Sequence, residues 1–466
     1  MLPVHLSMTE AQRSSLLAHL FPPDRCEAVA IALCGRAVGR DRNRLLVRRL
    51  EMIPYEICKV RAADQVTWPT HVLLPWLEEA RRNNWGVVKI HGHWGYPQFS
   101  TTDDISDRDL FPSLYEWTET DDPHASVILM QDGSMFGRVV TDKGGFVPLE
   151  SIAVVGDDIS FFRESRAAPP LPEFGRRIAQ SFGKGTFEVL RTLRIAVVGC
   201  SGTGSPVIEQ LARNCVGALV LVDPDVIEEK NLNRILNATM EDAQAARPKV
   251  EVAARSVRAM GLGTQVEVHA KSLLDIDVVR AVASCDVIFG CMDSIDGRHL
   301  LNKLATFYMQ PYIDLGVKIE ADGRGGVDQV AASVHYLKPG GSSLASRHVF
   351  TMEQVRAAGL KRTDPERYKG ELEEGYVRGV PEDRPAVVQL NTLVASLAVN
   401  ELLARLHPFR QEPNGDFAVT RVSLTHDIWD HEADGAPCKM LSRHVGRGDT
   451  NPMLDWAELT VHKELT

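Results

Sequence analysis

The sequence is poor in cysteine and has no long apolar run, and both absences restrict what the chain can be. Its 466 residues include only 8 cysteines, and no two of them form a C-x-x-C pair. A disulfide scaffold is therefore excluded, and reduced thiols are expected. Nowhere do 18 apolar residues follow one another, and residues 1–11 lack a basic stretch before an apolar core. The sequence thus predicts a cytoplasmic protein that neither is secreted nor spans a membrane.

A surplus of basic residues is also missing. Lys plus Arg is 52 and Asp plus Glu is 62, which gives a formal net charge of −10. This balance argues against a dedicated DNA-binding surface, and 44% hydrophobic residues argue against disorder. Several arginines lie between Arg36 and Arg49, but no aromatic residue lies among them. We interpret them as a solvated face or a surface for an acidic partner, and we expect no nucleic-acid partner.

The length allows two to four domains, and prolines mark one boundary. Residues 167–173 contain three prolines within four residues, which neither a helix nor a sheet can continue. Residues 1–166, with apolar runs at 28–34, 86–90 and 126–130 and an amphipathic stretch at 73–82, are expected to form a small mixed α/β domain. Residues 174–466 are expected to form a second domain.

The second domain shows alternating strand and helix patterns. Strands at 194–198 and 218–222 flank a helix at 206–214, which predicts an α/β fold with a doubly wound, mostly parallel, Rossmann-like sheet. Residues 338–385 are polar and too long for a tight connection, so they form either a mobile functional loop or an insert. Further strands are expected at 266–269, 287–290, 312–315 and 417–424, and further helices at 245–260, 298–308 and 387–406.

A glycine-rich turn follows the first of these strands. Gly199, Gly202 and Gly204 precede Ser205 and Pro206, which suit the N-cap and the first position of a helix. Glycines at a helix N-terminus allow close approach of a phosphate. The spacing is G-x-x-G-x-G rather than the dinucleotide pattern G-x-G-x-x-G. The glycines alone leave open a nicotinamide enzyme, an ATP enzyme and a purely structural turn.

Charged residues further along decide between these readings. Asp223, at a strand end, suits a ribose in either class of enzyme. Adenylation also needs cations, which offset charge on a triphosphate as pyrophosphate leaves, and a carboxylate for magnesium. Such residues occur in order after the turn: Asp225, Asn233, Arg234, Lys249 and Asp293.

With these motifs, residues 176–406 resemble the ThiF/MoeB and ubiquitin-activating-enzyme family of adenylating enzymes. The resemblance implies ATP-dependent adenylation of the C-terminal carboxylate of a ubiquitin-like protein. It implies that Arg177 reaches the ATP of a neighbouring subunit, so a homodimer is expected. The other implied roles are a phosphate turn at Gly199, Gly202 and Gly204, further nucleotide contacts from Asp225 and Asn233, ribose binding by Asp223, phosphate binding by Arg234 and Lys249, and Mg²⁺ binding by Asp293.

The chain departs from some members of this family at its cysteines. Relatives with a structural zinc carry two C-x-x-C pairs, and here only Cys438 remains, so we expect no such zinc. Relatives that form a thioester use a cysteine in the crossover loop, and residues 338–385 contain none. Cys438 is a weak candidate for this thiol, and thioester formation is left open.

A histidine pair points to a second chemistry in the first domain. His91 and His93 alternate along an expected strand and so share one face. With Asp104 they would form a zinc site that keeps one position open for water, as catalytic zinc does. Residues 25–140 resemble the JAMM (JAB) metalloprotease family, which cuts ubiquitin-like proteins from precursors or conjugates. The resemblance implies that Glu27 shuttles a proton and that the Thr101 hydroxyl faces the developing oxyanion.

Both resemblances lead to one substrate class. We expect a chain that joins a zinc peptidase to an adenylating domain, with ATP, Mg²⁺ and Zn²⁺ as cofactors and a ubiquitin-like protein as partner. The peptidase would trim a precursor before adenylation or remove conjugates afterwards. Two alternatives are activation of a sulfur-carrier protein for cofactor or cysteine synthesis, and a non-catalytic scaffold that only binds a ubiquitin-like partner.

Overall fold

The structure is a computed structural model that describes residues 1–163, 171–322, 324, 326–373 and 387–461. The chain forms two compact units. The first holds Met1–Ala168, Phe307–Met309 and His444–Thr450, and the second holds the remaining residues. Residues 167–170 of the expected linker lie outside the described part of the chain.

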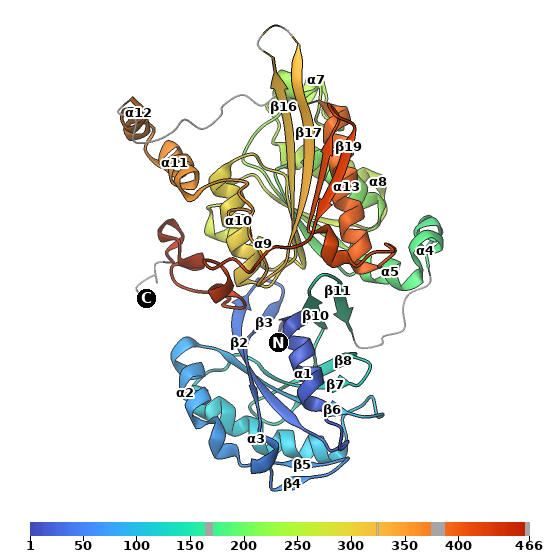
Figure 1. The fold of residues 1–466 in the computed structure, drawn as a ribbon, viewed down its shortest axis with the longest axis vertical. Helices are drawn as coiled ribbons and strands as arrows, with labels where there is room; N and C mark the ends of the chain where they lie inside the picture. The colour runs from blue at the N-terminus through green and yellow to red at the C-terminus, as the bar shows by residue number, and fades with distance from the viewer. Residues whose placement is uncertain (164–170, 323, 325, 374–386, 462–466) are drawn as a thin grey trace. The chain divides into compact units, whose positions relative to one another are not determined.

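The first unit is built on a nine-stranded mixed sheet in the order β11-β10-β1-β3-β2-β6-β7-β8-β9 (Figure 1). A separate pair of short strands is formed by β4 (Val60–Arg61) and β5 (Val66–Thr67). The helices are α1 (Glu10–Leu20), α2 (Leu74–Asn83) and α3 (Thr101–Thr118). The strands of the large sheet are β1 (Val4–Thr9), β2 (Val29–Val38), β3 (Asn43–Met52), β6 (Gly86–His93), β7 (His124–Met130), β8 (Met135–Val140), β9 (Phe146–Pro148), β10 (Ser151–Val155) and β11 (Ile159–Phe162).

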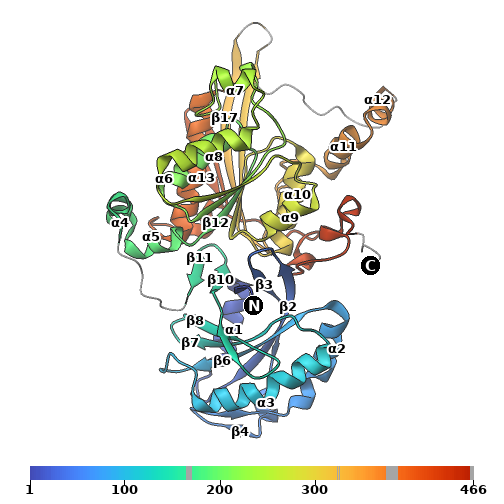
Figure 2. The same ribbon diagram turned by 180° about the vertical axis from the view of Figure 1, so that it is seen from behind.

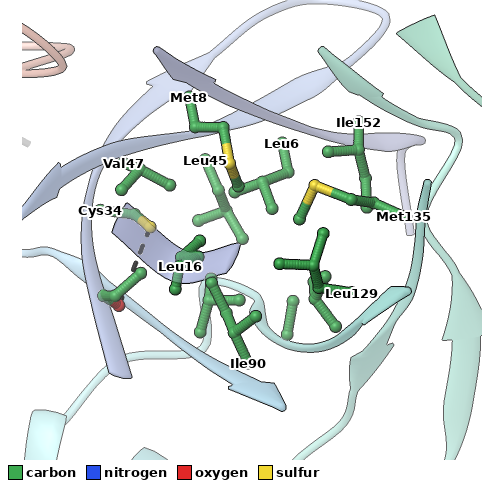
Figure 3. Packing of buried hydrophobic residues seen from close by; sticks show 14 of the residues in the cluster. Leu6, Met8, Leu16, Cys34, Leu45, Val47, Ile90, Leu129, Met135 and Ile152 are labelled. Carbon is green, nitrogen blue, oxygen red and sulfur yellow. Dashed lines mark hydrogen bonds between the residues drawn. The ribbon is translucent and has the colours of Figure 1, made fainter. Parts of the chain in front are cut away.

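Both faces of this sheet are buried, which explains the unbroken apolar run at 28–34. Alternate residues of β2 point to opposite faces. Ala30, Ala32 and Cys34 join a core that includes Leu16 of α1. Figure 3 shows Cys34 and Leu16 in this core. Val29, Ile31 and Leu33 pack beneath α2 and α3. Helices on both faces therefore fix the central strands, including β6 with its histidine pair.

The second unit contains an eight-stranded sheet in the order β14-β13-β12-β15-β16-β17-β18-β19. The first five strands in this order, β14, β13, β12, β15 and β16, pair in parallel, as expected for a Rossmann-like fold. The pairs from β16 to β19 are antiparallel, so the sheet is mixed. The strands are β12 (Arg194–Val198), β13 (Ala218–Val222), β14 (Gln265–His269), β15 (Val287–Gly290), β16 (Tyr312–Ala321), β17 (Val327–Leu337), β18 (Val419–Ser423) and β19 (Ile428–Glu432).

Helices cover both faces of the sheet. Figures 1 and 2 show α6, α8 and α13 on one face and α9 and α10 on the other, which is the arrangement that right-handed crossovers produce. The helices are α4 (Arg176–Phe182), α5 (Lys184–Leu190), α6 (Gly204–Arg213), α7 (Met240–Gln244), α8 (Lys249–Met260), α9 (Ile276–Ala283), α10 (Ile295–Phe307), α11 (Met352–Thr363), α12 (Pro365–Glu373) and α13 (Val388–Leu406).

The polar stretch 338–385 is partly helical, because it contains α11 and α12. Residues 374–386 of this stretch lie outside the described part of the chain. Within the described residues, none of the helices combines the length and the hydropathy that crossing a bilayer requires.

Candidate active sites

A cavity of about 520 Å³ lies where the strand order of the second unit reverses. Strand β12 lies between β13 and β15, and the residues that follow β12 and β15 line the cavity. Open α/β sheets bind ligands at this topological position. The predicted residues found in the cavity wall are Gly199, Gly202, Asp223, Asp225, Arg234, Lys249 and Asp293.

Glycine is required at two positions of the turn, because other backbone atoms lie too close to leave room for a Cβ. Gly199 has a φ of 94°, and a Cβ there would lie 2.6 Å from the carbonyl oxygen of Cys291. A Cβ on Gly204 would lie 1.8 Å from the carbonyl oxygen of Gly199. Gly204 is not in the cavity wall, so its role is to close the turn beneath the cavity. Gly199 and Gly202 are the turn glycines that face a ligand.

Backbone amides orient the Asp223 carboxylate. Its two oxygens accept hydrogen bonds from the amides of Cys200 and Asp225, at 2.7 Å and 2.9 Å. Burial raises the pKa of Asp223 above its ordinary value, while Lys249 acts in the opposite direction. The carboxylate at the end of β13 is thus held in one orientation before any ligand binds.

Cations and carboxylates both line this cavity. The Lys249 ammonium donates to Asp225 at 2.7 Å and lies 3.8 Å from Asp223. Arg234 donates to the carbonyl of Lys230 at 2.9 Å. Asp293, exposed in the wall, is the third residue after the end of β15. The wall therefore offers both cations for phosphates and a carboxylate suited to magnesium.

The first unit contains a compact cluster of side chains of the types that can bind a metal ion. His91 and His93 lie on one face of β6, both buried, with their Nε2 atoms 3.1 Å apart. The third member of the cluster is Asp103, whose oxygens lie 2.9 Å from Nε2 of His91 and 3.5 Å from Nε2 of His93. These hydrogen bonds lower the pKa of Asp103 despite its burial, so the carboxylate is ionised at neutral pH.

The prediction that Asp104 is the metal ligand is wrong. Helix α3 begins at Thr101, with Ser100 as its N-cap and Asp103 completing the capping box. This start turns Asp103 toward the histidines and Asp104 toward Arg138, whose guanidinium donates to it at 2.5 Å. With Asp103 in this position, Ser100 supplies the hydroxyl that lies three residues earlier in the sequence. This hydroxyl donates to Asp103 at 2.7 Å. Thr101, predicted for this position, is exposed.

The cluster fits a tetrahedral metal ion. Zinc bonds of 2.0–2.1 Å place neighbouring ligand atoms about 3.3 Å apart in a tetrahedron, close to the 2.9–3.5 Å separations of this cluster. Nδ1 of His93 lies 2.8 Å from the carbonyl of Tyr96, a typical orienting contact for a ligating imidazole. Nδ1 of His91 is buried and has no hydrogen-bond partner among the described residues.

Glu27 lies near the cluster without belonging to it. The residue precedes β2, and its amide donates to the carbonyl of Ala62 at 2.7 Å. Burial raises the pKa of Glu27 to about 7, and the charges of His93 and Asp103 act on it in opposite directions. A carboxylate with this pKa can take up and release a proton near neutral pH.

Comparison with known proteins decides the family of the second unit. The model of the ThiF family matches residues 174–434, which is more than half of the chain. The chain belongs to the ThiF family. The match begins at residue 174, so it concerns the unit that holds the cavity and not the histidine cluster.

Curated relatives of this ThiF-family chain match it over part of their length. "Ubiquitin-like modifier-activating enzyme 5" from Xenopus laevis is 28% identical over 33% of this chain and 39% of its own length. "Adenylyltransferase and sulfurtransferase MOCS3" from Sus scrofa is 34% identical over 27% of each chain. The alignments thus span less than half of either relative. Among solved structures, E. coli MccB is 17% identical, with a TM-score of 0.44 over 58% of this chain and 74% of MccB.

Besides Gly204, two further predicted residues lie outside the wall of the ThiF-family cavity. Asn233 lies outside its wall, where its side chain accepts a hydrogen bond from Arg234 at 3.3 Å. Arg177 is exposed on α4 and is also outside the wall, so its role toward a second subunit stays a prediction. Ser205 is not the N-cap of α6, which begins at Gly204. Its hydroxyl instead accepts from the amide of Leu236 at 3.0 Å.

Sequence reasoning missed five charged or amide residues of the cavity wall: Glu228, Lys230, Asn231, Arg298 and Asn391. Asn231 belongs to the same N-x-N-R motif as Asn233, and its position before the arginine gave a usable signal. Arg298 forms a buried ion pair with Asp314 of β16. Asn391 comes from α13, nearly 190 residues after the glycine turn, and no local sequence pattern predicts that it lines the cavity.

Two cysteines near the glycine turn, Cys200 and Cys291, are buried. Burial raises the pKa values of the Cys200 and Cys291 thiols, which keeps both protonated. Cys438 is also buried, and the Ser343 hydroxyl donates to its sulfur at 3.1 Å. Cys438 does not line the cavity.

Proposed function

We propose that the chain uses ATP to adenylate the C-terminal carboxylate of a ubiquitin-like protein. The observation that carries this proposal is the convergence of Gly199, Asp223, Arg234, Lys249 and Asp293 on one cavity of a ThiF-family domain. The names of the relatives, an activating enzyme for a ubiquitin-like modifier and an adenylyltransferase, support the same reaction. ATP and magnesium are the cofactors this reaction requires.

The proposed reaction is one displacement at phosphorus. A carboxylate oxygen of the partner attacks the α-phosphorus of ATP, the bond to the bridging oxygen of pyrophosphate breaks, and an acyl-adenylate forms. Asp223 accepts hydrogen bonds from the ribose, and the amides of the glycine turn donate to phosphate oxygens. Arg234 and Lys249 neutralise charge on the departing pyrophosphate. Asp293 would hold the magnesium ion, whose positive charge would offset the negative charge of the phosphates.

Exchange of labelled pyrophosphate into ATP tests this reaction. The assay would use the full chain and a fraction of small proteins from a cell extract. We expect exchange that needs both the chain and this fraction, and a loss of at least 100-fold in Asp293→Ala. Full exchange by Asp293→Ala would contradict the magnesium assignment. Binding of the small proteins without any exchange by the wild type would favour the scaffold alternative.

A sulfur-carrier protein is the second candidate partner, because one relative is named as both an adenylyltransferase and a sulfurtransferase. Both partners end in a carboxylate that the same cavity would activate. The final products distinguish the two partners. The C-terminus of a sulfur carrier becomes a thiocarboxylate, whereas the C-terminus of a modifier becomes joined to an amine. Mass spectrometry of the partner after reaction with ATP and a sulfur donor distinguishes the two.

We further propose that the first unit is a zinc peptidase for ubiquitin-like precursors or conjugates. His91, His93 and Asp103 would hold the zinc, which when bound lowers the pKa of water. Glu27 would take a proton from the attacking water and pass it to the leaving amine. The Ser100 hydroxyl, near Asp103, would replace Thr101 as the donor to the oxyanion. Cleavage of a precursor by the wild type but not by Glu27→Gln would support this activity.

We also propose a homodimer in which Arg177 of one subunit contacts the ATP of the other. Its exposure on α4 is consistent with such a contact. Sedimentation of the purified chain gives the oligomeric state. Pyrophosphate exchange restored by mixing Arg177→Ala with Asp293→Ala would show that the two residues act in trans.

A further inference from the structure

The side chain of Asn391 is a buried amide whose N–H group has no hydrogen-bond acceptor among the described residues. Asn391 is only 1% exposed and lies in the first turn of α13. Its Nδ2 is buried and makes no hydrogen bond to any described residue. Asn391 also belongs to the wall of the nucleotide cavity. Since an unpaired buried donor is unfavourable, the free protein holds this amide ready for an acceptor that arrives with a ligand.

The position of Nδ2 indicates the phosphate end of the cavity. A Cβ on Gly202 would lie 2.4 Å from Nδ2 of Asn391 and 3.2 Å from Cδ of Arg234. Asn391 is therefore beside a turn glycine and an arginine, the residue types that bind phosphate. A phosphate oxygen bound here would supply an acceptor for Nδ2.

Two helix N-termini meet at the same place. Gly202 of the turn before α6 lies beside Asn391, and further along Gln210 of α6 donates to Ser396 of α13 at 3.1 Å. The two helices therefore run in the same direction, and both begin beside residues of the cavity wall. Helix α13 has no side-chain N-cap, so its first amides are not satisfied by a capping side chain. The positive ends of both helix dipoles favour an anion here.

We propose that Asn391 is a phosphate ligand, whose Nδ2 donates a hydrogen bond to the triphosphate of ATP in the ThiF-family cavity. The inference rests on the proposed nucleotide site and adds a residue from α13 to it. Helix α13 thereby takes part in binding the nucleotide, in addition to packing against α6 and the sheet.

Binding of MgATP to the full chain, measured calorimetrically without any partner protein, tests the proposal. Loss of a hydrogen bond to a charged group weakens binding about 10- to 100-fold. We expect that loss in Asn391→Ala, and a greater loss in the near-isosteric Asn391→Asp, whose carboxylate repels phosphate. The matched control is Asn400→Asp on the exposed side of the same helix, where Nδ2 donates to the Ser396 carbonyl at 2.9 Å. This control is expected to bind MgATP as the wild type does.

Adenosine is the second probe, because it fills the base and ribose sites without a phosphate. Retained adenosine binding with weakened MgATP binding in both Asn391 variants supports the proposal. MgATP affinity within twofold of wild type in either variant would overturn it. Equal loss of adenosine and MgATP binding would also overturn it, because the residue would then support the cavity as a whole. Failure of the wild type to bind MgATP would refute the proposed function itself.

Discussion

Neighbouring aspartates at the start of α3 have different surroundings. Asp103 faces two imidazoles, whereas Asp104 forms an ion pair with Arg138. This contrast makes the zinc site testable with two substitutions one residue apart. The first residue of α3 determines which carboxylate faces the histidines. The spacing from His93 alone did not contain this information, so it led to the prediction of Asp104 instead of Asp103.

Zinc affinity is therefore expected to depend on Asp103 and not on Asp104. Replacing an outer-shell partner typically lowers metal affinity 10- to 100-fold, and loss of a direct ligand costs more. We expect Asp103→Ala to weaken zinc binding at least about 100-fold, as measured by competition with a chromogenic chelator. Asp104→Ala, which leaves Arg138 paired with Asp107, is the control and should bind zinc normally. Unchanged zinc content in a His91→Ala, His93→Ala double variant would contradict the site.

His299 predicts a pH dependence of stability. Burial lowers the pKa of this α10 histidine from 6.5 to about 4, with a smaller contribution from Lys303. Above pH 6.5 the imidazole is neutral in both folded and unfolded chains. Between pH 6.5 and about 4 only the unfolded chain takes up the proton, so stability falls by about 1.4 kcal/mol per pH unit.

The measurement is urea unfolding of the wild type and His299→Gln across this pH range. The wild type should lose about 3 kcal/mol more than the variant between pH 6.5 and pH 4. Parallel pH profiles for the two proteins would mean that His299 is already protonated in the folded state.

At the scale of elements, the strands of the second unit could be predicted better than the helix starts. The apolar runs at 194–198 and 218–222 form β12 and β13, as predicted. Short apolar runs bounded by turns are typical of buried strands. Helix α8 begins at Lys249 rather than at residue 245, since Pro248 keeps the preceding residue out of helical geometry. Asn391 could not have been predicted, because its place in the cavity depends on the packing of α13 against α6.

The glycine turn between β12 and α6 should not tolerate a side chain. In Gly199→Ala, the left-handed backbone and the Cβ contact with the Cys291 carbonyl should together cost about 2 kcal/mol or more. Gly185→Ala within α5 is a matched control, because its Cβ would meet no atom within 4 Å. That substitution should stabilise the chain by about 0.5–1 kcal/mol. Equal stability of both variants in urea unfolding would contradict the account of the turn.

The two units of the chain contain two candidate sites, and the family match covers only one of them. The second unit is a ThiF-family domain by its sequence, and its cavity contains most of the residues that the sequence alone indicated. The first unit was predicted as a peptidase from two histidines and a spacing, and its metal cluster differs by one residue from that prediction. A shared substrate class, a ubiquitin-like protein tail, is what would join the two activities in one chain.

The most direct test of the central claim is to trap the activated carboxylate. The full chain would be incubated with MgATP and a fraction of small proteins, and hydroxylamine would be added to convert any acyl-adenylate into a hydroxamate. We predict a small protein that carries the hydroxamate at its C-terminus in the wild-type reaction and not with Asp293→Ala. A wild-type reaction that yields no such product, or equal product from the variant, would contradict the proposed adenylation.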